Sequence, residues 1–139
     1  MSSAAVLLDT HAWIWLVDGN DELSLPARKL IDQAAATGTV LIASISVWEV
    51  AMLERKGRLV LSRSCWNWVE DALSLPGLRL IQLSAQTALE SCFLPGKFHD
   101  DPADRFIVAT ARLENAAIVT RDKQILRYAQ SGHVAAIKC

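Results

Sequence analysis

The sequence has almost no excess of charge of either sign and no long hydrophobic run. Its 139 residues include 14 Lys and Arg against 15 Asp and Glu, which gives a net charge of -1. Proteins that bind nucleic acid mainly through counterion release usually carry a clear basic excess, so any nucleic-acid contact here must be local. With 52% hydrophobic and 21% charged residues, the chain is not a disordered tail and can bury a sizeable core.

The features of secreted and membrane proteins are also missing from the sequence. The most apolar interval, residues 38–53, is short for a membrane helix and contains Glu49. The N-terminus lacks a basic region, and Asp9 interrupts its apolar stretch, so we expect no signal peptide. Three cysteines lie far apart and form no CxxC pair: Cys65, Cys92 and Cys139. This usage favours a reducing compartment, and we expect a cytoplasmic protein without a membrane span.

Short aliphatic runs of strand length alternate with segments of helical character. The predicted strands are residues 4–8, 40–43, 79–83, 116–120 and 134–137. The predicted helices are residues 11–17, 26–36, 47–56, 65–73, 85–92, 102–115 and 123–130. Because parallel strands need crossover connections and are buried on both faces, the alternation predicts a three-layer α/β/α fold with a parallel sheet. We find no internal repeat or linker and expect a single domain over residues 1–139.

Four acidic residues stand where the sequence is otherwise apolar, near the points where strands meet helices. Two of them, Asp9 and Asp122, directly follow predicted strands. Each is also a suitable N-cap for the helix that comes next. Position alone therefore leaves a structural and a functional interpretation open for both residues.

Glu49 is the third of these acids. Together with Ser46 it fits a capping box, in which the Glu side chain bonds the backbone N–H of the Ser. Its neighbours one helical turn away are apolar: Ile45, Met52 and Leu53. A carboxylate on such a face needs a partner, which favours a functional interpretation alongside the structural one.

Asp104 is the fourth acid and occupies the third position of its predicted helix. It shares a helix face with Ile107, Val108 and Ala111, so it stands at the top of an apolar stripe. Asp101 lies one turn earlier and fits an N-cap before a proline. For Asp101, helix capping and a site role are both open interpretations.

In an open parallel sheet, ligands bind in the crevice beyond the carboxyl ends of the strands. Several carboxylates that converge there repel one another, which raises their pKa values unless a cation neutralises them. Mg²⁺ and Mn²⁺ prefer oxygen ligands and can activate water and stabilise charge on a phosphoryl oxygen. The four acids together therefore predict metal-assisted phosphodiester hydrolysis.

Four segments of the chain also resemble the PIN domain family, and more narrowly the VapC-type toxins of bacterial type II toxin–antitoxin modules. The segments are LLDTHAWIWL (7–16), ISVWEVAMLERKGRLVL (45–61), HDDPADRFIVATA (99–111) and IVTRDKQI (118–125). They occur in the family's order and span nearly the whole chain. The resemblance implies a Rossmann-like PIN fold with a five-stranded parallel sheet, and a Mg²⁺- or Mn²⁺-dependent endoribonuclease.

The resemblance also implies roles for individual residues. The family's acidic positions correspond to Asp9, Glu49, Asp104 and Asp122, which would hold the metal and serve catalysis; Asp101 matches an additional acid, and Thr120 matches a hydroxyl residue that positions metal or water. A metal-activated water would attack phosphorus in line and leave a 5′-phosphate and a 3′-hydroxyl. The implied partners are a cognate antitoxin, an RNA substrate and a second copy of the chain. One metal ion or two, the RNA target and the antitoxin's identity are not determined by the sequence.

Some other residues carry two interpretations each. Arg58 belongs to the basic segment of residues 55–58, in which Gly57 is a helix stop. The segment fits either an RNA phosphate contact or a cationic helix end. His11 and His99 flank acidic motifs and are either general acids or solvated side chains. The chain has five tryptophans: Trp13, Trp15, Trp48, Trp66 and Trp68. Because two of their pairs are spaced two apart, we expect part of this set to face a partner protein or a dimer mate.

Two other classes of function compete with the nuclease. A phospho-acceptor or haloacid-dehalogenase-like phosphatase would need a second acid near Asp9, but Thr10 and His11 follow it. A catalytically silent PIN module would serve as an RNA-binding or protein-interaction scaffold. Such modules tend to lose acids, whereas every matched position here is acidic.

Overall fold

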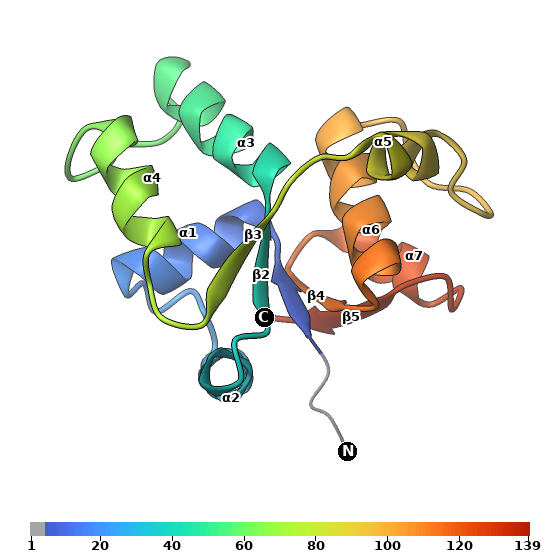
Figure 1. Cartoon of the computed structure of the whole chain (residues 1–139), viewed down its shortest axis with the longest axis horizontal. Helices are drawn as coiled ribbons and strands as arrows, with labels where there is room; N and C mark the ends of the chain where they lie inside the picture. The colour runs from blue at the N-terminus through green and yellow to red at the C-terminus, as the bar shows by residue number, and fades with distance from the viewer. Residues whose placement is uncertain (1–4) are drawn as a thin grey trace.

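The computed structural model describes residues 5–139 and contains one five-stranded sheet flanked by helices (Figure 1). The elements in chain order are β1 (Val6–Leu8), α1 (Thr10–Asp18), α2 (Leu25–Ala36), β2 (Val40–Ala43), α3 (Ser44–Arg55), α4 (Cys65–Leu73), β3 (Leu78–Ile81), α5 (Ala85–Cys92), α6 (Pro102–Glu114), β4 (Ala117–Thr120), α7 (Lys123–Ala129) and β5 (Ala135–Lys138). The strand order is β3-β2-β1-β4-β5, and every pair is parallel. The predicted three-layer α/β/α fold with a five-stranded parallel sheet is confirmed.

The two faces of the sheet have separate cores because side chains alternate along each strand. Val6 and Leu8 of β1 point into a core shared with α1, α2, α3 and α4. Leu7, between them, points into the other core, formed with α6 and α7. Figure 1 shows these two helical layers on opposite sides of the strands. The central strands β1, β2 and β4 are nearly all buried, which explains why they read as continuous apolar runs.

The predicted boundaries differ from the observed ones by a few residues, with one informative exception. Residue 4 of the first predicted strand lies outside the described residues. Helix α3 begins at Ser44, directly after β2, three residues before the predicted start. Its N-cap is Ala43, which offers no capping side chain. The predicted capping box between Ser46 and Glu49 is therefore wrong, because Ser46 lies inside the first turn of the helix.

The tryptophans divide between the core and the surface. Trp13 and Trp68 are fully buried and pack edge to face, with ring centroids 5.2 Å apart. For these two the partner-facing interpretation is wrong, because burying large rings between α1 and α4 stabilises this layer. Trp48 and Trp66 are 54% and 88% exposed, and for them a partner contact stays a prediction. Within residues 5–139, no helix is long and apolar enough to cross a membrane.

Candidate active site

The candidate site lies at the carboxyl ends of β1 and β4, the two neighbouring strands at the centre of the sheet. Asp9 follows β1 directly, and Asp122 comes two residues after β4 ends. Glu49 lies in α3, the helix that continues from β2, and Asp104 lies in the first turn of α6. Because parallel strands end at one edge, four residues far apart in sequence reach the same crevice.

Asp9 is both the N-cap of α1 and a buried acid. Its Oδ1 accepts the backbone N–H of Thr10 at 2.8 Å, and its Oδ2 accepts the hydroxyl of Thr120 at 2.7 Å. Only 9% of the residue is exposed. Burial raises the pKa of Asp9, and the two hydrogen bonds oppose that rise. The structural and functional interpretations are thus compatible for this residue, because one carboxylate has an oxygen for each neighbour.

Glu49 is held by a side chain from another helix. The Thr10 hydroxyl donates to Glu49 Oε1 at 2.5 Å and lies 2.9 Å from the Ser46 Oγ. Burial raises the pKa of Glu49, the Thr10 bond lowers it, and the negative charges of Asp9 and Asp101 raise it further. The partner that the apolar helix face requires is therefore Thr10.

Asp104 is an acid of the cluster whose pKa is strongly raised. Burial, followed by the charges of Asp122, Asp101, Asp9 and Glu49, raises its pKa from 3.8 to about 8. All four of the other acids act on it in the same direction, which places the five carboxylates within electrostatic reach of one another.

His99 is a basic neighbour of Asp104. Its Nε2 lies 2.9 Å from Asp104 Oδ2. His99 is thus beside a site acid, in contrast to His11, which is exposed in the first turn of α1 and lies against Trp15 at 6.0 Å between ring centroids. A general-acid role stays a prediction for both.

Two further acids cap helices at the rim of the crevice. Asp122 Oδ1 accepts the backbone N–H groups of Gln124 and Ile125, at 2.8 and 3.0 Å. Asp101 is exposed, and its Oδ2 accepts the backbone N–H of Asp104 at 2.9 Å. Both residues are thus helix caps. In each case the capping hydrogen bonds use one carboxylate oxygen and leave the other oxygen out of the cap.

Thr120 links two of the acids. Its hydroxyl accepts the backbone N–H of Asp122 at 2.9 Å and donates to Asp9 Oδ2 at 2.7 Å. The residue is fully buried. With both contacts made, this buried hydroxyl fixes the orientation of the Asp9 carboxylate. The role of Thr120 in positioning metal or water stays a prediction.

The remaining predicted site residue does not join the cluster. Arg58 is exposed and lies three residues past the end of α3, beyond Gly57, whose φ of 72° closes the helix. This is the cationic helix end with a glycine stop that the sequence indicates. A role of Arg58 in RNA contact stays a prediction.

Thr10 is the site residue to which the sequence reasoning assigned no role. It is 1% exposed and contacts both acids of this side of the cluster, one through its backbone and one through its hydroxyl. The sequence feature that could have indicated its role is the position of this hydroxyl residue directly after Asp9, the acid that follows β1. Its partner Glu49 is 39 residues away, so local spacing could not identify the contact.

The donor chemistry of the cluster fits a hard divalent cation. All five acids offer carboxylate oxygens, the ligands that Mg²⁺ and Mn²⁺ prefer. Burial, together with the charges of neighbouring acids, raises the pKa values of Asp9, Glu49 and Asp104, and a bound cation would favour their charged forms. Across residues 5–139, however, no group of three or more His, Cys, Asp or Glu side chains is placed so that it could hold a metal ion.

Comparison with known proteins agrees with this architecture. Residues 6–131 match the PIN domain family. This chain belongs to the PIN domain family. Over 120 residues it is 31% identical to a curated PIN relative, Ribonuclease VapC22 of Mycobacterium tuberculosis, covering 86% of this chain and 88% of the relative.

Solved structures share the PIN fold at lower identity. VapBC2 from Rickettsia felis, bound to a DNA fragment from its promoter, matches with a TM-score of 0.67 at 18% identity, covering 96% of this chain and 98% of that one. FitAcB from Neisseria gonorrhoeae matches with a TM-score of 0.63 at 22% identity, covering 95% and 96%. DNA-bound VapBC from Salmonella typhimurium matches with a TM-score of 0.66 at 14% identity, covering 98% of each chain. These likenesses concern the fold.

Proposed function

We propose that the chain is a cytoplasmic, Mg²⁺- or Mn²⁺-dependent endoribonuclease and the toxin of a type II toxin–antitoxin pair. The observation that carries the proposal is the convergence of the acids at one edge of the sheet, where burial and, after it, the charges of the other acids raise the pKa of Asp104 to about 8. Such a cluster is costly to keep without a cation. It lies in a PIN domain whose curated relative is named a ribonuclease.

The proposed roles follow from the contacts. Asp9, Glu49, Asp104 and Asp122 would hold the metal directly or through water, with Asp101 adding charge at the rim. When bound, the metal supplies an activated water and stabilises charge on a phosphoryl oxygen.

The chain's own part in the reaction is to orient the acids before the substrate arrives. Thr120 and the Thr10 N–H fix the two oxygens of Asp9, and the Thr10 hydroxyl fixes Glu49. Because these side chains are locked by hydrogen bonds, little reorganisation is needed when RNA binds. The proposed cleavage is in line and yields a 5′-phosphate and a 3′-hydroxyl.

Substitution of Asp9 tests the proposal. Asp9→Asn keeps an oxygen for the helix cap but loses the charge, so the fold should persist while RNA cleavage in Mg²⁺ is lost. Asp32→Asn is the matched control, since Asp32 is exposed on α2, away from the crevice. Labelled structured RNA is incubated with each protein in Mg²⁺ and in EDTA. Retained cleavage by a folded Asp9→Asn protein contradicts the assignment, and RNA binding without any cuts favours the silent PIN module instead.

We also propose a cognate antitoxin and a homodimer as partners. Several solved structures with this fold are toxin–antitoxin complexes or VapBC assemblies. On this chain, Trp66 and Val69 of α4 border an apolar pocket of about 390 Å³ with Val47 of α3. Light scattering of the isolated chain at micromolar concentrations should give the mass of a dimer, and a monomer throughout that range contradicts this part of the proposal.

A further inference from the structure

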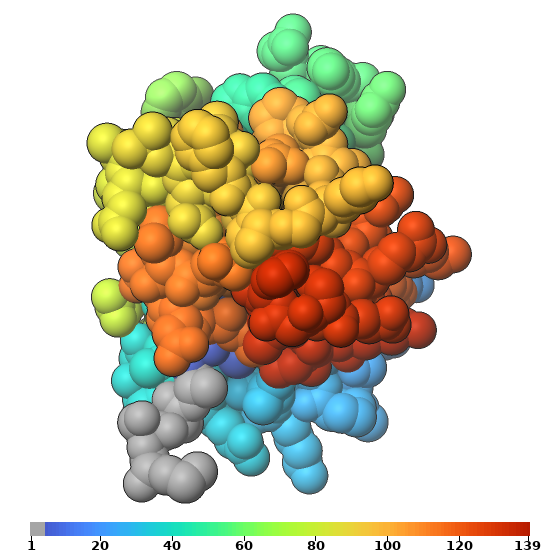
Figure 2. All heavy atoms as spheres, turned by 90° about the vertical axis from the view of Figure 1, so that its right-hand side faces the viewer, coloured from blue at the N-terminus to red at the C-terminus, as the bar shows by residue number. Residues whose placement is uncertain are grey.

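A second charged region, of opposite sign, lies beside the acid cluster. It is a pocket of about 620 Å³ between the loop that follows α5 and the helix α7. Figure 2 shows this side of the molecule, with the segment after α5 directly above α7. We call it the loop–α7 pocket; its lining includes Lys97, Phe98, His99, Gln124, Arg127 and Tyr128. Its volume falls in the range of about 300–1,000 Å³ found for ligand sites.

The charges around the loop–α7 pocket are all basic. Lys97, Arg105 and Arg127 line it, and no Asp or Glu is among its lining residues. Arg105 is occupied by backbone carbonyls, but Lys97 and Arg127 are exposed. In the described part of the chain, neither Lys97 nor Arg127 forms a side-chain hydrogen bond or ion pair. Two such cations at one pocket are available to bind an anion.

The loop is held rigidly in place. The Arg105 guanidinium donates to the carbonyls of Ser91, Phe98 and His99, at 2.7, 2.9 and 3.1 Å. From the other side, the Tyr128 hydroxyl of α7 donates to the carbonyl of Pro95 at 2.5 Å. The pocket is thus formed before any ligand binds, which lowers the entropy cost of binding.

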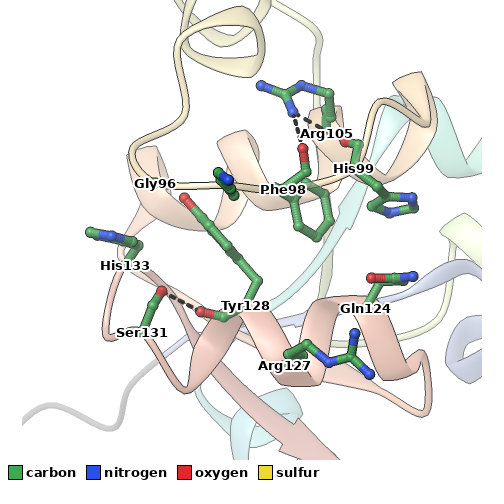
Figure 3. A pocket seen from close by; sticks show the side chains of 10 residues that line it. Gly96, Phe98, His99, Arg105, Gln124, Arg127, Tyr128, Ser131 and His133 are labelled. Carbon is green, nitrogen blue, oxygen red and sulfur yellow. Dashed lines mark hydrogen bonds between the residues drawn. The ribbon is translucent and has the colours of Figure 1, made fainter.

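Aromatic rings form part of the pocket wall. The rings of Phe98 and Tyr128 lie 4.9 Å apart, and those of Tyr128 and His133 lie 5.7 Å apart. Figure 3 shows Phe98 directed from the loop toward α7, with Tyr128 directed from α7 toward the loop. Tyr128 is only 5% exposed, so a base would stack on the half-buried Phe98 beside the cations. Stacking on an aromatic ring next to cations that contact phosphates is how proteins hold single-stranded nucleic acid.

The pocket is continuous with the acid cluster along two elements. His99 lines the pocket and also lies 2.9 Å from Asp104. Helix α7 starts at the Asp122 cap and carries Gln124 and Arg127 on one face. With a rise of 1.5 Å per residue, Arg127 lies about 7.5 Å along the axis from Asp122. A strand whose scissile phosphate is at the acids therefore reaches the pocket with a neighbouring nucleotide.

We propose that the loop–α7 pocket binds the RNA nucleotide next to the scissile bond, with Lys97 and Arg127 contacting its phosphate. This inference rests on the proposed ribonuclease function and assigns a substrate-binding site to it. Arg127 also has a structural interpretation, as a cation in the last turn of α7. A cation at a helix end does not explain why Lys97 lies at the same pocket. Nor does it explain why hydrogen bonds fix the pocket loop and why no carboxylate lines the pocket.

Binding measurements without metal separate this pocket from the chemistry of the acids. Fluorescence anisotropy of a short labelled single-stranded RNA is recorded in EDTA at several NaCl concentrations. The double variant Lys97→Gln/Arg127→Gln should bind at least about tenfold more weakly, because charged hydrogen bonds are lost. Its log–log salt slope should be lower by about 1.4, from two phosphates at about 0.7 each.

The matched control removes the same charge elsewhere. Lys29→Gln/Arg79→Gln changes two exposed cations, on α2 and on the edge strand β3. This control should keep the affinity within about twofold and leave the salt slope unchanged. Circular dichroism and thermal melts should show both variants folded, since none of the four side chains forms a hydrogen bond or ion pair within residues 5–139.

The outcomes distinguish this inference from the proposed function. Metal-dependent cleavage by the unaltered chain together with unchanged RNA affinity of the Lys97/Arg127 variant overturns the pocket and leaves the nuclease standing. Weakened RNA binding in that variant supports the pocket even if the unaltered chain cuts no RNA. If the variant loses affinity for a labelled poly-glutamate peptide but keeps its affinity for RNA, the pocket binds an acidic polypeptide and the inference is wrong.

Discussion

The acid cluster and the loop–α7 pocket are neighbours with opposite charge and different internal bonding. In the cluster, Thr10 and Thr120 lock the carboxylates, and burial raises the pKa of three of them. In the pocket, Lys97 and Arg127 are exposed, and the loop backbone is what is locked. The net charge of -1 is thus a sum over residues that are separated in space. The acidic region is suited to bind a cation, and the basic region is suited to bind a phosphate.

Kinetic measurements on two variants test whether the acid cluster and the loop–α7 pocket have separate roles. Asp9→Asn should lower kcat for RNA cleavage by more than the roughly 10- to 100-fold cost of losing an outer-shell partner of a metal. Lys97→Gln/Arg127→Gln should instead raise KM at nearly constant kcat, because it removes binding that is equal in ground and transition states. Steady-state kinetics on one RNA measures both. A kcat defect in the pocket variant equal to that of Asp9→Asn would show that the two regions act as one.

Removing the Thr10 hydroxyl should have the next largest effect. Thr10→Val keeps the shape but leaves Glu49 without its donor, and we expect activity to fall about 10- to 100-fold. Thr10→Ser restores the hydroxyl and should restore most of the activity, as measured by initial cleavage rates at saturating Mg²⁺. Equal activity of the Val and Ser variants would mean that the hydroxyl does not position Glu49.

Gly96 tests the rigidity of the pocket loop. Its φ is 70°, and an added Cβ would lie 3.2 Å from the His133 ring. Gly96→Ala should destabilise the fold by about 1–2 kcal/mol through the left-handed backbone, with a further cost from the ring contact.

Gly57→Ala is the control for the Gly96 variant, since Gly57 has a φ of 72° but nothing within 4 Å. Urea unfolding of both variants isolates the contact with His133. A smaller loss of stability for Gly96→Ala than for Gly57→Ala would indicate a mobile loop.

A further expected effect is a pH dependence of stability in the metal-free protein. The pKa of Asp104 is raised from 3.8 to about 8, so between those values the folded state binds more protons than the unfolded state. The free energy of unfolding should therefore decrease as pH rises from about 5 toward 8. Added Mg²⁺ should offset the loss at the higher pH, because it binds only the native acids.

Urea midpoints in EDTA and in Mg²⁺ across this pH range measure the effect. Asp104→Asn should flatten the metal-free profile, since the amide does not titrate. A metal-free midpoint that rises with pH would contradict the repulsion that we infer in the cluster.

The alternation of apolar runs and helical segments predicted the architecture because it depends on local patterns. Strands buried on both faces are uniformly apolar, and Asp101 before a proline marks a helix start, where its side chain caps α6. Local pattern failed at α3, which begins at Ser44, so Ser46 lies inside the first turn and Glu49 accepts a hydrogen bond from Thr10. A tertiary partner there replaced a local one.

The sequence by itself determined the βα order, the helix caps and the acids at strand ends, because these follow from contacts within a few residues. Only the tertiary structure decided which strands are neighbours, and hence that Asp9 and Thr120, 111 residues apart, share a hydrogen bond. It also decided that Trp13 packs on Trp68 and that Lys97 and Arg127 border one pocket. Parallel pairing and helix packing join distant segments, and no local pattern encodes which segments meet.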